Sequence, residues 1–357
     1  FPDLLSRQKR IDHAHPTTGD WLFDTEKFTR WQGDQGLQES NGVFWIKGKP
    51  GAGKSTLMKH MLLHLEKSGK YLIAAHFFNA RGGALEKSPL GMLRSLVYQL
   101  LQLDGSEILW RPFCGIYQEK LRLNGSFEWT EYDLKDFLLR HLPSCELSKP
   151  LLILVDALDE CNKEEVRGMV KFLEDLSRVA RHGSASLKLR LRIGLSSRHY
   201  PEISMHVQIE LDLDDCDDHD DDIDRYVRDN LKTHDNDIRS DVVERSSSIF
   251  MWVVLVVELL NEACGCGQVQ LMRRILDDIP TGLEELFERI LMKRQPNYRR
   301  DGTHLQWVLF CNYDYYGLLR ARELYFAVMS GVEPGSLGNL LRSGISDEHI
   351  HKSIKYW

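Results

Sequence analysis

Residues 48–56 read GKPGAGKST and stand between the apolar run GVFWI and the helical pattern LMKHMLLHLEKS. Glycines at this spacing let the backbone turn tightly, so that its N–H groups can face a phosphate group. The N-terminus of the following helix adds partial positive charge at the same point. The stretch therefore predicts a phosphate-binding loop between a strand and a helix, as in nucleoside triphosphatases.

This loop has an expected role for each of its residue types. We expect Lys54 to reach the β- and γ-phosphates and the Ser55 hydroxyl to ligate Mg²⁺. The alternative interpretation is a glycine-rich turn before an ordinary helix, which leaves the lysine and serine at this spacing unexplained. The predicted nucleotide-binding residues of the loop are Gly48, Lys49, Pro50, Gly51, Ala52, Gly53, Lys54, Ser55 and Thr56.

Five short apolar runs rich in β-formers predict strands, and helical patterns separate most of them. This alternation predicts an α/β fold of the P-loop NTPase kind, with an ASCE-type parallel sheet in three α/β/α layers. The charge alternation in KLRLRI (188–193) predicts an outer strand with one face in water. The predicted strands are VFWIKG (43–48), YLIAAHFF (71–78), LLILVD (151–156), LRLRIGLSS (189–197) and VQIEL (207–211).

The second candidate motif is LLILVDALDE (151–160), which opens with an apolar run typical of a strand buried on both faces. Asp156 ends this strand at the sheet edge where ligands gather, and we expect it to hold Mg²⁺ through a water molecule. Asp159 and Glu160 follow as candidate catalytic residues that would orient or deprotonate an attacking water. The alternative is a solvated acidic turn. One predicted strand, 71–78, separates the two motifs, as expected when the magnesium-binding strand does not follow the phosphate-loop strand directly.

The third candidate motif is GLSSRHYP (194–201), at the end of the next strand. An arginine at this position, Arg198, can point toward the γ-phosphate and respond to its presence. A surface arginine near a strand end is the alternative interpretation. The neighbouring His199 is as compatible with a structural role as with a functional one.

Composition argues against several classes of function. A net charge of −7 over 357 residues gives no overall basic surface, which argues against a nucleic-acid partner. The seven cysteines form no CxxC pair, which favours reduced thiols and a cytoplasmic location. The most apolar stretch, IFMWVVLVVELL (249–260), is too short to cross a membrane and predicts a buried helix. The chain begins at Phe1 rather than Met, and we interpret it as part of a longer protein.

The sequence changes character after residue 211, where the acidic run DLDDCDDHDDDID begins an all-helical region. The last part alternates short helical patterns that fit a small winged-helix-like unit. The predicted domains are a lead segment that encloses the nucleotide (1–40), an NTPase core (41–212), a helical domain (213–281) and a winged-helix-like domain (282–357).

Together, the three motifs resemble those of the NACHT class of signal-transduction NTPases, in particular the fungal NOD-like receptors. The stretches DDIPTGLEELFERIL and RELYFAVMSG are also similar to that family, and the resemblance covers nearly the whole chain. The magnesium motif is its most specific marker. NACHT proteins carry a small residue after the first aspartate and then an acidic pair, and Ala157, Asp159 and Glu160 match this pattern.

The resemblance implies a nucleotide held between the core, a helical domain and a winged-helix domain. This nucleotide would be ATP or ADP with Mg²⁺, with GTP as an alternative. Arg198 would sense the γ-phosphate, Pro280 would lie against the base, and HAHPTTGDWL (13–22) would help to enclose the base. Many relatives also place a winged-helix histidine on the β-phosphate. This sequence shows no aligned match, although His304 lies in the same broad region.

The predicted function is a nucleotide-dependent switch in a fungal receptor of innate immunity or heterokaryon incompatibility. The diphosphate form would be closed and silent. Exchange for the triphosphate would permit homo-oligomerisation and signalling toward programmed cell death, with slow hydrolysis supported by the acidic pair. Effector and sensor domains would lie outside this chain, and no membrane partner is expected. Two alternatives stay open: an ATPase with sustained turnover, and a nucleic-acid-linked ATPase of the AAA type.

Overall fold

The computed structural model describes residues 6–293, except positions 104, 106, 125–127, 146, 163, 183–188, 200–204, 207 and 265–268. The chain divides into two compact units, residues 1–277 and 278–357, and each is described by itself. The three nucleotide motifs lie in the first unit. Most of the predicted winged-helix-like domain, together with His304, lies outside the described residues.

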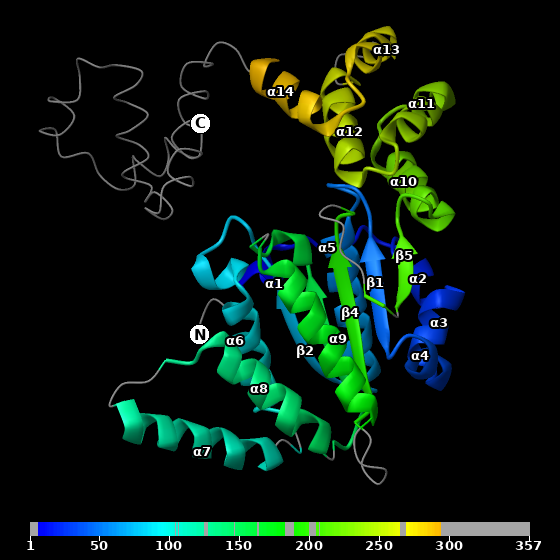
Figure 1. Cartoon of the computed structure of the whole chain (residues 1–357). Coiled ribbons are helices and arrows are strands. Elements are labelled where there is room, and N and C mark those ends of the chain that lie inside the picture. The colour runs from blue at the N-terminus through cyan, green and yellow to red at the C-terminus, as the bar shows by residue number, and fades with distance from the viewer. Residues whose placement is uncertain are drawn as a thin grey trace, which may run out of the picture. The chain divides into compact units, whose positions relative to one another are not determined.

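A five-stranded parallel sheet forms the centre of the first unit (Figure 1). Its strands are β1 (Val43–Lys47), β2 (Leu72–Phe77), β3 (Leu151–Asp156), β4 (Leu191–Ser197) and β5 (Ile209–Asp212). Their order across the sheet is β2-β3-β4-β1-β5, and every neighbouring pair is parallel. β4 therefore separates the phosphate-loop strand β1 from β3, which carries the predicted magnesium-binding aspartate. This arrangement confirms the predicted α/β fold with an ASCE-type sheet.

Helices cover both faces of the sheet and complete the three predicted layers (Figure 1). Alternate residues of β1 show the division, because successive side chains of a strand point to opposite faces. Phe44 and Ile46 pack with α5 and the segment before β1, whereas Val43 and Trp45 pack with α6, α8 and α9. The helices before β5 are α1 (Ser6–Arg10), α2 (Trp21–Asp24), α3 (Glu26–Gln32), α4 (Asp34–Glu39), α5 (Lys54–Ser68), α6 (Pro89–Leu100), α7 (Glu107–Asn124), α8 (Glu131–His141) and α9 (Val166–His182), with short 3-10 turns η1 (Ala84–Lys87), η2 (Leu142–Ser144) and η3 (Leu158–Glu160).

The position of β4 corrects one expectation. The alternation of charged and apolar residues predicted an outer strand, but β4 lies between β1 and β3 and all of its residues are buried. Arg192 can be buried there because its guanidinium donates hydrogen bonds to the carbonyl oxygens of Trp31, at 3.0 Å, and Gly33, at 3.1 Å. These carbonyls lie at the end of α3, so the arginine caps a helix instead of facing water.

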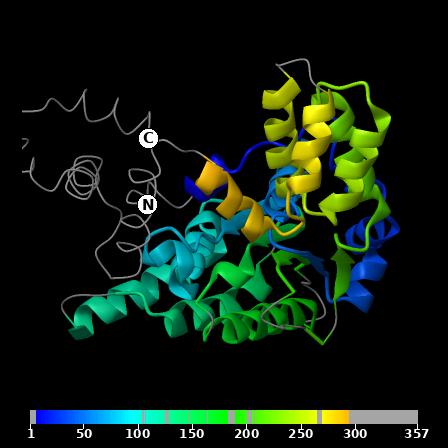
Figure 2. The ribbon, with the colours of Figure 1, turned by 90° about the horizontal axis from the view of Figure 1, so that it is seen from above.

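A helical region follows β5 and forms a bundle (Figure 2). Its α12 contains the predicted buried helix, because Trp252, Val253, Val256 and Leu260 are all fully buried. Among the described helices, none is long and apolar enough to cross a membrane. The helices of this region are α10 (Asp217–Asn230), α11 (Asn236–Ser246), α12 (Phe250–Cys264) and α13 (Val269–Asp278). The second unit, described by itself, contains α14 (Leu283–Lys293).

Candidate nucleotide-binding site

The predicted phosphate loop connects β1, which ends at Lys47, to α5, which begins at Lys54. Gly51 and Gly53 have φ angles of +80° and +97°, a region that glycine occupies at little cost. At Gly48 a Cβ atom would lie 3.2 Å from the Leu213 Cβ, which is tighter than ordinary packing. The glycines of the motif are therefore required by the local backbone and by close packing against the chain after β5.

The Lys54 side chain folds back over this loop. Its Nζ donates hydrogen bonds to the carbonyl oxygens of Gly48 and Lys49, both at 2.7 Å. Burial lowers the pKa of Lys54, and the negative charges of Asp159 and Asp156 oppose that shift. The Lys54 ammonium group therefore feels the negative charges of Asp159 and Asp156. A bound phosphate group would supply negative charge at the same place.

Asp156 is fully buried at the end of β3, and serine hydroxyls surround it. The Ser196 hydroxyl donates to its Oδ1 at 2.5 Å and accepts a hydrogen bond from the Ala157 N–H at 2.9 Å. Burial raises the pKa of Asp156, while hydrogen bonds from Ser196 and Ser55 and the positive charge of Arg7 lower it. Within the described residues its Oδ2 is buried without a hydrogen-bond partner. A free carboxylate oxygen beside the Ser55 hydroxyl is a donor set that suits Mg²⁺.

The acidic pair and the predicted sensor arginine lie at the same edge of the sheet. The Arg198 N–H donates to Asp159 Oδ1 at 2.9 Å, and its Nε lies 3.0 Å from Asp159 Oδ2. The Glu160 carboxylate accepts a hydrogen bond from the Ala80 N–H, in the loop after β2, at 2.9 Å. Ala157 allows the chain to reach these partners by taking a left-handed conformation, with φ of +55°. Both predicted catalytic carboxylates are therefore already engaged by donors.

Asp214 is a site residue that the sequence motifs did not single out. Its Oδ1 accepts a hydrogen bond from the Lys49 N–H at 3.0 Å, and its Oδ2 lies 3.1 Å from His199 Nε2. It lies two residues after the end of β5, within the acidic run 212–224 that begins the helical region. The run contains many aspartates, and nothing in the sequence distinguishes Asp214 from the others as the one that faces the phosphate loop.

The helical region also contacts the phosphate loop. The Met251 N–H, in the first turn of α12, donates to the Gly51 carbonyl at 2.9 Å. Lys49 Nζ donates to the Ser247 carbonyl at 3.2 Å. Ser247 and Ser248 just before α12 have φ angles of +48° and +64°, a conformation that costs energy for residues with a Cβ atom. The start of α12 is thus held against the loop by hydrogen bonds to its backbone.

The predicted lead segment packs on α10. Asp222 of α10 accepts hydrogen bonds from the Gly19 N–H at 2.6 Å and from the Trp21 Nε1 at 2.7 Å. The His15 ring lies edge-on to Tyr226, with centroids 5.2 Å apart, and Tyr226 lies 5.2 Å from the Phe250 ring of α12. The segment predicted to enclose the base is thereby fixed to the helical region. Pro280 belongs to the second unit, so its position relative to this segment is not described.

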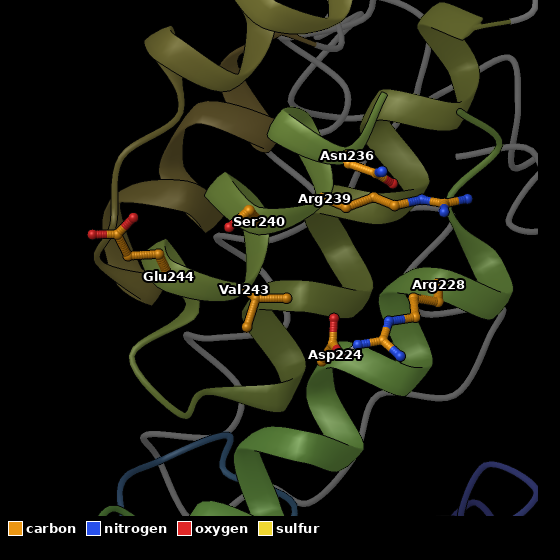
Figure 3. Close-up of a pocket in the computed structure, with 7 residues that line it drawn as sticks. All are labelled: Asp224, Arg228, Asn236, Arg239, Ser240, Val243 and Glu244. Carbon is orange, nitrogen blue, oxygen red and sulfur yellow. Dashed lines mark hydrogen bonds and ion pairs between the residues drawn. The ribbon is translucent and has the colours of Figure 1, made fainter. Parts of the chain in front are cut away.

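A cavity of about 430 Å³ lies apart from these residues, between α10 and α11 (Figure 3). Arg228 points toward Asp224 within it, and the two form an ion pair along α10. None of the predicted nucleotide-binding residues lines this cavity. Its lining residues are Asp224, Arg228, Asn236, Arg239, Ser240, Val243 and Glu244.

Comparison with models of known protein families shows to which family the chain belongs. Residues 17–198, just over half of its length, match the family described as Nephrocystin 3, N-terminal. The chain belongs to this family. The matched range contains the phosphate loop, the magnesium motif and Arg198, whereas α10 to α13 lie beyond it.

A curated relative extends the match past the Nephrocystin 3, N-terminal region. The vegetative incompatibility protein HET-E-1 of Podospora anserina is 24% identical over 296 residues, which is 76% of this chain and 20% of that protein. The chain therefore spans about a fifth of the relative's length. With the motifs and the fold, these matches make the chain a NACHT-like nucleotide-binding NTPase region.

Several solved structures show a partial similarity of backbone to this chain. The Aeropyrum pernix ORC2 protein in ADPNP–ADP complexes has a TM-score of 0.44 and 12% identity, covering 98% of this chain and 88% of that one. Cdc6p from Pyrobaculum aerophilum has a TM-score of 0.46 and 8% identity, covering 94% and 88%. Drosophila ORC bound to DNA has a TM-score of 0.45 and 11% identity, covering 98% and 80%.

Proposed function

We propose that this chain is a nucleotide-dependent switch that is closed with a bound diphosphate and open with a triphosphate. The observation that carries the proposal is the direct attachment of α12 to the phosphate loop, through Met251 and Gly51 at 2.9 Å. A ligand shifts a conformational equilibrium only by its different affinity for the two states. A loop that binds phosphates and also holds a helical region can supply such a difference.

The binding roles in this proposal follow the contacts around the loop. The backbone of residues 48–56 and Lys54 would bind the phosphates. Ser55 and the free oxygen of Asp156 would hold Mg²⁺, which supplies positive charge against the phosphate oxygens. ATP or ADP is the proposed nucleotide, with GTP as the alternative. The lead segment would help to enclose the base, and Pro280 is a further proposed nucleotide-binding residue.

Slow hydrolysis is the expected consequence of how the acidic pair is held. Asp159 forms an ion pair with Arg198, and Glu160 accepts a hydrogen bond from the Ala80 N–H. Both oxygens of Asp159 are engaged by Arg198, so Asp159 must give up a donor before it can deprotonate a water molecule, and the hydrogen bond to Glu160 Oε2 makes that carboxylate a weaker base. A γ-phosphate would compete with Asp159 for Arg198, and this competition is the proposed means of sensing the triphosphate.

The wider role rests on the relative's name and on the domain plan. We propose that the chain comprises a lead segment (1–40), an NTPase core (41–212), a helical domain (213–281) and a winged-helix-like domain (282–357). In the open state, copies of the chain would assemble with each other. The link to incompatibility or innate immunity, and to cell death, is proposed from the similarity to a vegetative incompatibility protein. Effector and sensor domains would act from outside this chain.

The test is to purify the chain, denature it and identify the released nucleotide by chromatography. Wild type is compared with Lys54→Ala and with the matched control Lys67→Ala, which changes an exposed lysine of the same helix. We expect a stoichiometric diphosphate in wild type and in the control, and its loss in Lys54→Ala. An empty wild-type monomer that hydrolyses triphosphate at about 1 s⁻¹ or faster would overturn the switch and favour an ordinary ATPase. Salt-dependent DNA binding would favour the nucleic-acid-linked alternative.

A further inference from the structure

The short helix α1 is tied to the phosphate-loop helix α5 by a buried lysine. Lys59 of α5 donates a hydrogen bond to the Ile11 carbonyl, and only 7% of either residue is exposed. The Ile11 N–H in turn donates to the Arg7 carbonyl at 3.2 Å, and α1 contacts β2. The helix that carries Arg7 is therefore fixed to the sheet and to the phosphate-loop helix.

The turn that ends α1 packs, through Ile11, on the face of the sheet to which Asp156 points. Leu152 and Leu154 of β3 pack in the same apolar cluster as Ile11, and Asp156 follows them at the next alternate position. Phe77 of β2 belongs to that cluster and pairs with Asp156 in the sheet register. The positive charge of Arg7 acts on the Asp156 carboxylate from this side.

Arg7 is only half-buried, and its Nε is the part of the guanidinium that lacks a partner among the described residues. Its Nε is buried without a hydrogen bond, and no carboxylate oxygen forms an ion pair with its guanidinium. Asp156 Oδ2 is the matching buried oxygen without a donor. An enclosed N–H without an acceptor is unfavourable, so a group with acceptor oxygens is expected beside Arg7, whereas Mg²⁺ would satisfy Asp156 Oδ2. A guanidinium fork fits phosphate oxygens well.

We propose that Arg7 binds the terminal phosphate of a bound nucleoside triphosphate. In the sheet order, β3 with Asp156 lies between β2, beneath α1, and β4, which ends next to Arg198. The two arginines would thus approach the phosphate from opposite sides of the magnesium position. This inference rests on the nucleotide site of the proposed function and adds a second contact that only the triphosphate can make. It also makes the segment before residue 13 sensitive to the phosphate state.

The test compares Arg7→Ala with Arg10→Ala, an exposed arginine of the same helix. Affinities for a fluorescent diphosphate and for a fluorescent non-hydrolysable triphosphate, both with Mg²⁺, are measured by titration. We expect Arg7→Ala to weaken triphosphate binding by about tenfold or more, the loss typical of a charge-assisted phosphate contact, and to leave diphosphate binding within about twofold. Arg10→Ala should change neither affinity, and Arg7→Lys should restore part of the triphosphate affinity.

Two further results separate the inference from the proposed function. Wild-type protein that binds neither nucleotide would overturn the nucleotide site and the inference with it. If Lys54→Ala abolishes binding of both nucleotides while Arg7→Ala behaves like wild type, the site stands and the role of Arg7 is wrong. An equal loss of both affinities in Arg7→Ala, together with lower thermal stability without nucleotide, would show that the arginine only balances the buried charge of Asp156.

Discussion

Asp222→Ala is expected to release the lead segment from the helical region. The substitution removes the acceptor of two hydrogen bonds, from the Gly19 N–H at 2.6 Å and the Trp21 indole at 2.7 Å. The first donor is buried and loses its partner outright, at about 1–3 kcal/mol, while water can partly replace the second, at about 1 kcal/mol. We therefore expect the free energy of unfolding to fall by about 2–4 kcal/mol.

The assay combines urea denaturation with hydrogen exchange of residues 13–22. Asp221→Ala is the matched control, because this exposed neighbour carries the same charge. Exchange should accelerate in the lead segment of Asp222→Ala and not in the control. Bound nucleotide should also dissociate faster if the segment encloses the base. Equal stabilities and equal exchange for the two variants would contradict this prediction, because the hydrogen bonds to Asp222 would then contribute no net free energy.

Two other predictions follow from buried polar groups. Ser196→Ala leaves both the Ala157 N–H and Asp156 Oδ1 without their partner, so we expect urea denaturation to show a loss of about 1–3 kcal/mol and Mg²⁺ titration to show weaker support of nucleotide binding. Burial lowers the pKa of His76 from 6.5 to about 4, so the unfolded chain binds the proton first and stability is lost as pH falls from 6.5 to 4. The loss across that window is about 3 kcal/mol, and His76→Phe should flatten the stability–pH curve there, whereas an unchanged curve would contradict the assignment.

The fold was accessible from sequence because its signals are local. An uninterrupted apolar run such as LLILV predicts a strand that is buried on both faces, and the alternation of strands and helices predicts parallel pairing. The prediction was wrong where the local pattern was ambiguous. The alternating arginines in KLRLRI predicted an outer strand with one face exposed to solvent. The structure places β4 at the centre, because Arg192 finds carbonyl partners at the end of α3, about 160 residues earlier in the chain.

The residue roles at the phosphate loop stay predictions, but their neighbourhood could not have been read from the motifs. Asp214 sits in a run of aspartates that all look alike, and only the packing of β5 beside β1 brings it to the Lys49 N–H. Likewise, Ser196 appears in the sequence as one of two serines at a strand end. The structure shows that its hydroxyl joins Asp156 to the Ala157 N–H.

Local sequence patterns were enough to predict the phosphate loop, the buried strand before Asp156 and the α/β class, because glycine spacing and apolar runs act on the backbone within a few residues. The packing of elements distant in the chain, in contrast, determines which charges face that loop and which contacts hold the lead segment and α12. Arg7 and Asp222 meet their surroundings across about 150 and 200 residues of chain. Such contacts depend on how whole helices and strands pack together. The sequence around a charged residue does not indicate which distant residue will become its partner.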